Sequence, residues 1–267
     1  MESTRICCPQ IDHFILVDKA DIDLFRPLAG PRTHIVDSRE LMGPQFHTVP
    51  FCPRWWVSAR TWPLRGWITQ QLRKLAMPAI ADHDIFVNVD SDVVFVREFS
   101  QDDLFVDGRL ALLEVDYQNE ELGKWTDISE KLLGLPKSGE IFNYVGMLIP
   151  WWRNEVVSLT EKLESLWDQP WQVTLGQRHN FSEYMLYGNY VRKRRGFENA
   201  GHVADLRPLI QTSWHKDTSS QMGLKSLFSD LPSETVGVMV HSKDRIDPAD
   251  YRSHVESYWD GRLPTAA

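Results

Sequence analysis

The chain has 267 residues, of which 42% are hydrophobic and 25% are charged, and its formal net charge is −8. This composition excludes a collagen-like, coiled-coil or disordered protein, and a chain of this length can bury a core without disulfides. The acidic balance argues against general binding to nucleic acid or to an anionic membrane. We therefore expect one folded domain over residues 1–267.

Cysteine usage and the N-terminal sequence indicate the cellular compartment. The three cysteines, Cys7, Cys8 and Cys52, fit neither a disulfide framework nor a zinc-site spacing. The N-terminus lacks the apolar segment of a signal peptide, and no run approaches the ~18 apolar residues of a membrane span. We expect a protein without a transmembrane segment, in the reducing cytoplasm or peripheral at the inner membrane face.

Four short apolar runs predict strands. They cover residues 13–17, 85–89, 110–113 and 236–240. Near-continuous apolar runs are typical of strands buried on both faces of a mostly parallel sheet flanked by helices, so the pattern predicts an α/β fold. Ligands bind at the carboxyl ends of strands in such sheets. The residues that follow the four runs are Asp18, Asp90-Ser91-Asp92, Glu114 and His241-Ser242-Lys243.

Helical periodicity appears in two segments, and a third helix start is indicated by a capping residue. Apolar residues recur at helical spacing over 65–77, which Pro78 ends, and over 154–168, where Asn154 can cap the helix. Ser182 followed by Glu183 predicts the start of a third helix. The segment 43–63, rich in Pro, Trp and Arg, is predicted to be a long ordered loop.

The segment Asp90-Ser91-Asp92 carries the clearest chemical signal. Two carboxylates two residues apart project to one side of an extended chain. They repel each other unless a cation lies between them, and oxygen ligands suit Mg²⁺ or Mn²⁺. Such a cation keeps positions open for substrate phosphates. The alternative is a strand end followed by a turn with solvated carboxylates.

Four motifs occur in order along the chain. They are the segments Gly66–Leu75, Phe86–Phe95, Phe142–Gly146 and Phe181–Gly188. Over about residues 11–241 the chain thereby resembles the GT-A class of nucleotide-sugar-dependent glycosyltransferases, and more narrowly an uncharacterised bacterial family with a glycosyltransferase-like pattern. The resemblance implies a GT-A, Rossmann-like single domain with a donor half at about 1–115, an acceptor half at about 116–245 and a C-terminal tail at 246–267.

The resemblance also implies a metal and donor site. Asp92 would ligate the cation directly, Asp90 would reach the cation or the donor ribose, and His241 would be a third ligand. Lys243 would touch the diphosphate, and Asp18 would lie near the nucleoside. The alternative for His241 is a residue at a strand end with a local hydrogen bond. For Lys243 it is a solvated lysine, and for Asp18 it is a surface turn.

Further residues are implied as donor and catalytic groups. Glu183 would be the base that takes the proton of the acceptor hydroxyl, with helix-dipole pairing as its alternative. Lys74 would pair with donor phosphate and Gln71 with sugar or base, or both would belong to an exposed polar face. Asn143 and Gly146 would lie under the donor sugar, where Gly146 permits close backbone approach or simple packing.

Aromatic and basic clusters remain open between a ligand-binding and a structural role. Trp55, Trp56, Trp151 and Trp152 are either acceptor platforms or core residues. The basic run 192–195 either contacts a phosphate on the acceptor or on a lipid carrier, or is a solvated loop.

The motifs together predict a metal-dependent glycosyltransferase that uses Mn²⁺ or Mg²⁺. It would transfer a sugar from a nucleoside diphosphate, with a UDP-sugar as first expectation, to a hydroxyl of a glycan or glycolipid in bacterial surface glycan synthesis. A nucleotidyltransferase is the first alternative, but residues 11–30 lack a phosphate-binding loop rich in Gly and basic residues. A non-catalytic carbohydrate-binding protein is the second, and it has no need for Asp90, Asp92 and His241 together. Oligomeric state and stereochemistry remain open.

Overall fold

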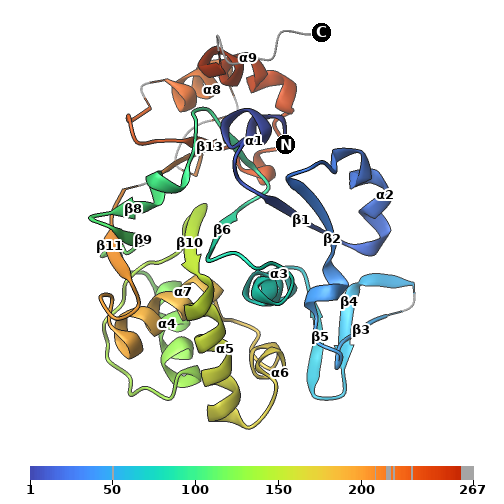
Figure 1. Cartoon of the computed structure of the whole chain (residues 1–267), viewed down its shortest axis with the longest axis vertical. Coiled ribbons are helices and arrows are strands. Elements are labelled where there is room, and N and C mark those ends of the chain that lie inside the picture. Colours follow the sequence, from blue (N-terminus) through green and yellow to red (C-terminus); the bar gives the residue numbers. More distant parts are fainter. Residues whose placement is uncertain (50, 208, 215–217, 219, 230, 260–267) are drawn as a thin grey trace.

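Short strands and helices alternate along the chain in a mixed α/β domain (Figure 1). The computed structural model describes residues 1–259 apart from 50, 208, 215–217, 219 and 230. The helices are α1 (Glu2–Cys7), α2 (Ile22–Phe25), α3 (Trp67–Ala76), α4 (Glu120–Leu132), α5 (Arg153–Trp167), α6 (Trp171–Gly176), α7 (Glu183–Asn189), α8 (Gln221–Phe228) and α9 (Pro248–Trp259). The strands are β1 (His13–Val17), β2 (Thr33–Asp37), β3 (His47–Val49), β4 (Cys52–Ser58), β5 (Thr61–Arg65), β6 (Ile85–Val89), β7 (Val93–Phe95), β8 (Phe105–Val106), β9 (Arg109–Leu113), β10 (Leu148–Trp152), β11 (His202–Asp205), β12 (Ile210–Thr212) and β13 (Gly237–Met239).

The strands form small sheets of mixed direction rather than the mostly parallel central sheet that the sequence predicts. Among the described residues the sheets are β1–β2, β10–β6, β11–β9–β8, β12–β13–β7 and β3–β4–β5. The parallel pairs are β1–β2, β11–β9 and β12–β13, and the other five pairs are antiparallel. A turn at Asp90 explains part of the difference, because it sends β6 and β7 into separate sheets. The α/β class is confirmed, and the single parallel sheet is not observed.

The predicted strands and helices are confirmed with small shifts at their ends. The four apolar runs form β1, β6, β9 and β13, and the two periodic segments form α3 and α5. The expected cap of α5 is displaced, since the helix begins at Arg153 and Asn154 lies inside its first turn. The third helix, α7, begins at Glu183, with Ser182 Oγ accepting from the backbone N–H of Met185 (3.4 Å).

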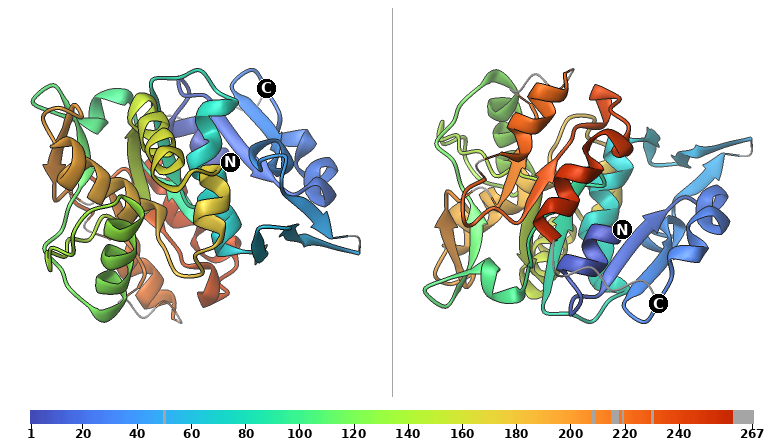
Figure 2. Two further views of the ribbon diagram at one scale, coloured as in Figure 1. Left: turned by 90° about the horizontal axis from the view of Figure 1, so that it is seen from below. Right: turned by 90° about the horizontal axis from the view of Figure 1, so that it is seen from above.

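The predicted long loop at 43–63 is wrong for most of its length. It contains β3 and β4 and the start of β5, which pair antiparallel, and these strands project from the body of the domain (Figure 2). Trp, Val and Thr favour a pleated surface, and Pro63 lies on the edge strand β5, where a missing N–H is tolerated. Pro63 therefore marks a strand edge rather than a loop.

Two hydrophobic clusters form the core. One includes residues of α3, α5, α7 and β10, and the other includes residues of α1, α8, α9, β7 and β13. The expected tail 246–267 is largely α9, whose Val255 and Trp259 are buried, while 260–267 lies outside the described residues. Arg252 of α9 pairs with Glu2 of α1 (2.9 Å), so the first and last described helices lie together. No helix within the described ranges has the length and apolar character to cross a membrane.

Candidate active site

Helix α3 provides the first two predicted site residues. Its apolar residues Ile68, Leu72 and Leu75 recur on one side and are buried, which fixes the helix against the core. Gln71 is fully buried rather than part of an exposed polar face, and the side chain of Lys74 is 21% exposed. Both therefore point toward other parts of the protein.

Lys74 joins three segments that are distant in the sequence. Its Nζ lies 3.0 Å from Glu183 Oε1 and 3.4 Å from Asp90 Oδ1. It also donates to the hydroxyl of Tyr184 (2.9 Å) and lies 4.4 Å from the centre of the Tyr184 ring. The structure thus brings together Lys74, Asp90 and Glu183, three of the residues that the sequence marks for one site.

The charges in this cluster shift the acid–base properties of its members. Burial raises the pKa of the Glu183 carboxyl, and Lys74 only partly offsets this. Burial lowers the pKa of Lys74, but Tyr184, Glu183 and Asp90 outweigh it, so its pKa lies above the usual value. Lys74 is therefore charged at neutral pH, and Glu183 is a more basic carboxylate than a solvated one.

Gln71 connects α3 to the start of α7. Its Oε1 accepts a hydrogen bond from the backbone N–H of Glu183 (2.8 Å), which satisfies one free donor at the helix N-terminus. The buried Gln71 Nε2 has no hydrogen-bond partner among the described residues. A buried amide nitrogen without a partner is costly, so within the described part of the chain Gln71 is a strained member of the cluster.

The acidic motif lies in a turn, and the expected extended geometry is wrong. The backbone N–H of Val93 donates to Asp90 O (3.2 Å), which closes a turn between β6 and β7. The two carboxylates consequently face different partners. Asp90 faces Lys74, whereas Asp92 Oδ2 accepts from the backbone N–H of Ser242 (3.2 Å).

Pairing of β7 with β13 places the late histidine beside the acidic motif. Met239 pairs with Val93, and the backbone N–H of Val240 donates to Asp92 O (3.1 Å). His241 therefore follows directly after a strand that contacts Asp92. Lys243 follows two residues later, in the short 3-10 segment Ser242–Asp244, and is exposed.

The ring of His241 is engaged in its own turn. Its Nδ1 accepts a hydrogen bond from the backbone N–H of Lys243 (3.3 Å). Within the described ranges, no three His, Cys, Asp or Glu side chains form a group that could hold a metal ion.

Two carboxylates nevertheless suit a divalent cation. The Asp90 side chain is 38% exposed, and Asp92 uses one oxygen in its hydrogen bond to Ser242. Mg²⁺ is often bound through one or two carboxylates, with water and phosphate oxygens completing its shell. Asp90 and Asp92 fit this pattern, and His241 as a third ligand stays a prediction.

Asp18 belongs to a neighbouring ion pair. It accepts from the Arg73 guanidinium (3.0 Å) and from Ser38 Oγ (3.0 Å) at the carboxyl end of β1. Arg73 is 9% exposed and lies 5.7 Å from the centre of the Trp56 ring. Since Arg73 precedes Lys74 in α3, Asp18 helps to hold the helix that carries the Lys74 cluster.

Asn143 and Gly146 lie at a separate cavity rather than in contact with the Lys74 cluster. Asn143 bridges to Val115 and caps its own loop by accepting from the backbone N–H of Val145 (3.0 Å). A Cβ on Gly146 would meet the side chains of Ile149 and Leu113 at 2.7 and 2.9 Å. The glycine therefore permits close packing of side chains.

Two of the tryptophans that could be acceptor platforms, Trp56 and Trp151, are core residues. Trp56 and Trp151 are buried, and Trp151 stacks on Tyr187 with ring centres 5.0 Å apart. Trp152 is partly buried and donates its indole N–H to Gly201 O (3.1 Å). The aromatic rings of Trp56 and Trp151 are unavailable to a ligand.

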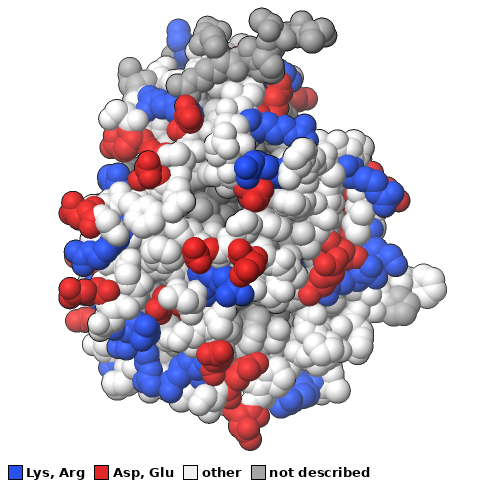
Figure 3. Space-filling view, viewed as in Figure 1, with Lys and Arg blue, Asp and Glu red and all other residues white. Residues whose placement is uncertain are grey.

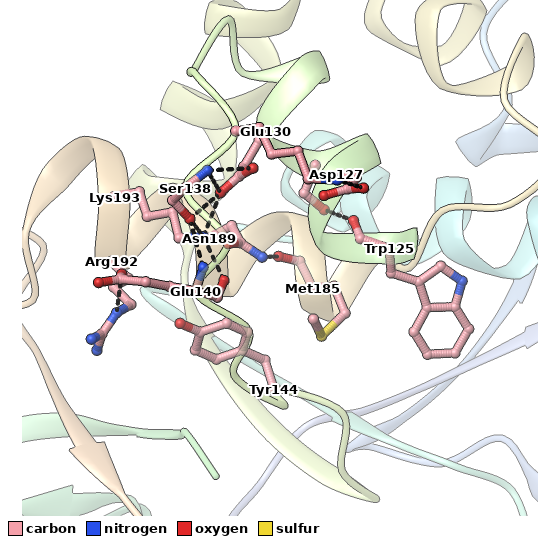
Figure 4. Close-up of polar contacts among 12 residues, drawn as sticks. Trp125, Asp127, Glu130, Ser138, Glu140, Tyr144, Met185, Asn189, Arg192 and Lys193 are labelled. Atoms are coloured by element: carbon pink, nitrogen blue, oxygen red, sulfur yellow. Dashed lines mark hydrogen bonds and ion pairs between the residues drawn. The ribbon is translucent and has the colours of Figure 1, made fainter. Parts of the chain in front are cut away.

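The basic run 192–195 is neither a loop nor a free anion site. It forms the end of a π-helical segment, Tyr190–Arg195, and three of its side chains pair with poorly exposed glutamates. Lys193 contacts Glu130 Oε1 (2.6 Å) and Ser138 Oγ (2.9 Å), as Figure 4 shows. The ion pairs of the run are Arg192–Glu114, Lys193–Glu130 and Arg195–Glu155. The run therefore links α4, α5 and the end of β9 to the helix that carries Glu183.

Acidic and basic side chains are interspersed over the face of the molecule drawn in Figure 3.

The sequence predicts no role for two residues of the site. Tyr184 lies in the motif that contains Glu183, but no spacing rule indicates that its hydroxyl reaches Lys74. Arg73 lies in another motif, and only its place next to Lys74 could have suggested a part in the site. Both contacts depend on packing between elements that are far apart in the sequence.

Comparison with known proteins gives a family. No curated protein matches the chain. A family described as a family of unknown function, DUF6492, matches residues 7–261, which is nearly the whole chain and includes Lys74, Asp90, Glu183 and His241. This protein therefore belongs to the DUF6492 family.

Proposed function

We propose that this protein is a metal-dependent glycosyltransferase that uses a nucleoside-diphosphate sugar. The observation that carries the proposal is the position of Lys74, 3.0 Å from Glu183 and 3.4 Å from Asp90. The proposal includes a GT-A type of architecture, for which the parallel β1–β2 pair ending at Asp18 is supporting evidence. It also includes a glycan or glycolipid acceptor and a cytoplasmic reaction.

The donor diphosphate would bind between the acidic turn and α3. Asp90 and Asp92 would hold Mn²⁺ or Mg²⁺, which would neutralise the charge that develops on the departing nucleoside diphosphate. The Lys74 ammonium lies beside Asp90, where it can contact a phosphate oxygen. Gln71 Nε2 supplies a further donor without a partner among the described residues.

Glu183 would accept the proton of the acceptor hydroxyl. The acceptor oxygen then forms a bond to the anomeric carbon, and the bond from that carbon to the phosphate oxygen breaks with its electron pair leaving on the phosphate. The pKa of Glu183, raised mainly by burial, favours proton uptake. Because its side chain is only 3% exposed, bulk water has little access to this carboxylate.

Calorimetry with a panel of nucleotide sugars tests the proposal. UDP-, GDP-, CDP- and dTDP-sugars are titrated with Mn²⁺, and again after EDTA. We expect one nucleotide to bind with Mn²⁺ and EDTA to weaken it, because the cation links the carboxylates to the diphosphate. Asp92→Asn should remove the metal dependence, whereas Asp82→Asn, whose side chain is 99% exposed, should not. Absence of metal-linked binding for every nucleotide would refute the proposal.

A further inference from the structure

A cavity of about 230 Å³ lies among β9, β10, β11 and β12. Most of its lining residues are apolar, among them Leu113, Val145, Leu148 and Ile210. Few polar residues line it, and the charged ones are Asp205 and Arg207. A cavity of this kind favours an apolar group of about the size of one ring.

The cavity adjoins the candidate active site on two sides. Leu148, in its wall, pairs with Val89, the residue that precedes Asp90. Thr212, also in its wall, pairs with Met239, and the next residue, Ser213, accepts from the backbone N–H of His241 through Oγ (3.1 Å). The cavity walls β10 and β12 therefore pair directly with β6 and β13, the strands that lead to the acidic turn and toward His241.

Arg207 lines the cavity with a side chain that is 38% exposed overall. Its Nε is paired with Asp205 Oδ2 (2.8 Å), but its buried Nη2 has no hydrogen-bond partner among the described residues. A buried guanidinium nitrogen without a partner is costly, and an oxygen of a bound molecule would satisfy it. Exposed Leu206 and Trp214 also line the cavity and extend its apolar surface toward solvent.

We propose that this cavity binds the apolar part of the acceptor, an aryl or compact alkyl group that carries an oxygen toward Arg207. The role of this molecule as acceptor rests on the proposed function, whereas its binding does not. A sugar ring is a poor occupant, because the apolar walls would leave most of its hydroxyls without hydrogen-bond partners. Asn143 and Gly146, expected under the donor sugar, line this cavity.

Three small probes test the chemical class. Binding of 4-methylphenol, 1,4-dimethylbenzene and methyl β-glucoside is measured by calorimetry and by ligand-observed NMR on the full chain without metal or nucleotide. We expect both aryl probes to bind and methyl β-glucoside not to bind. Arg207→Met should weaken binding of 4-methylphenol about tenfold, because a hydrogen bond from a charged donor is lost. It should leave binding of 1,4-dimethylbenzene unchanged, since that probe has no oxygen.

A matched pair of substitutions locates the binding. Ala111 lines the cavity from β9, whereas Ala204, on the neighbouring strand β11, is exposed and outside the lining. Ala111→Leu should weaken the aryl probes at least tenfold by filling the space, and Ala204→Leu should not. Thr212→Leu fills the opposite wall and replaces Ala111→Leu if thermal melting shows that the latter is unfolded.

The outcomes separate this inference from the proposed function. If wild type binds no aryl probe, or if Ala111→Leu, or its replacement Thr212→Leu, binds as tightly as Ala204→Leu, the cavity proposal is overturned, whatever the nucleotide panel shows. Equal binding of methyl β-glucoside and 4-methylphenol overturns the aryl assignment. Selective aryl binding supports the cavity site even if no nucleotide sugar binds, in which case only its role as an acceptor site is lost.

Discussion

The ammonium of Lys74 and the carboxylate of Glu183 form an ion pair of 3.0 Å between helices α3 and α7. Glu183 is nearly inaccessible to solvent, so its charge depends on Lys74 for compensation. The same ammonium contacts Asp90 of the acidic turn. One side chain thus couples the stability of the helix contact to the charge of the candidate metal site.

Removing Lys74 should destabilise the fold by leaving Glu183 buried and unpaired. We expect Lys74→Met to cost about 3 kcal/mol in the free energy of unfolding, measured with urea at pH 7. Glu183→Gln in the same background should recover part of this loss, because the neutral amide needs no counter-charge. If the effects of the two substitutions on the unfolding free energy were additive, Glu183 would not depend on Lys74 for charge compensation.

Loss of Lys74 should strengthen cation binding, although it weakens the fold. An ammonium 3.4 Å from Asp90 opposes the approach of a second cation. Lys74→Met should therefore tighten Mn²⁺ binding in the absence of nucleotide, by roughly tenfold. Lys124→Met is the charge-matched control, since Lys124 pairs with Glu120 on the exposed side of α4. Unchanged or weaker Mn²⁺ binding in Lys74→Met would count against Asp90 as a ligand.

Glu183→Gln should separate catalysis from donor binding. The amide keeps the shape of the side chain but cannot accept the proton of the acceptor, so transfer should fall by at least ~100-fold. Binding of the nucleotide sugar by calorimetry should persist. A normal transfer rate in this variant would remove Glu183 as the base and leave it the role of holding Lys74.

The position of α7 depends on a glycine that contacts an aromatic ring. A Cβ on Gly188 would come within 2.1 Å of Cγ in Tyr144, and that ring is buried and hydrogen-bonded to Glu114. Gly188→Ala should cost about 2 kcal/mol by overpacking. Gly30→Ala is the control with no atom within 4 Å, and it should change stability by less than about 0.5 kcal/mol. Equal melting temperatures for the two variants would show that the helix shifts freely.

Local sequence patterns predicted the elements of the site better than their contacts. Apolar runs and helical periodicity located β6, β13 and α3, and the Ser182 cap located the start of α7. These features depend on nearby residues, as does the order of the motifs. The contact of Lys74 with Glu183 depends on how α3 packs on α7, which no periodicity encodes.

The differences between sequence and structure have physical causes. An extended chain is predicted at the acidic motif, but the hydrogen bond from the backbone N–H of Val93 to Asp90 O closes a turn there. The basic run was predicted to face solvent or a phosphate, because glutamates from α4, α5 and the end of β9 are far away in the sequence. The segment 43–63 was predicted as a loop because its prolines outweighed its β-favouring residues.

His202 should make the fold sensitive to acid. It is fully buried between β9 and α7, where Nδ1 donates to Leu110 O (3.0 Å) and Nε2 accepts from the Tyr187 hydroxyl (2.8 Å). Burial lowers the pKa of His202 to about 4, although the bond to Leu110 opposes this. The unfolded chain binds a proton below about pH 6.5, and the folded chain does so only near pH 4. Stability from this group is therefore complete above pH 6.5 and is lost as the pH falls toward 4, by about 3 kcal/mol in all.

Urea unfolding at pH 7, 5.5 and 4.5 measures this dependence. In His202→Asn the fall in unfolding free energy between pH 7 and 4.5 should be smaller than in wild type, because the titrating group is gone from both states. The comparison uses the change with pH rather than the absolute stability, since loss of the Tyr187 hydrogen bond destabilises the variant at every pH. Parallel curves for the two proteins would mean that other groups carry the acid sensitivity and that His202 is protonated within the fold.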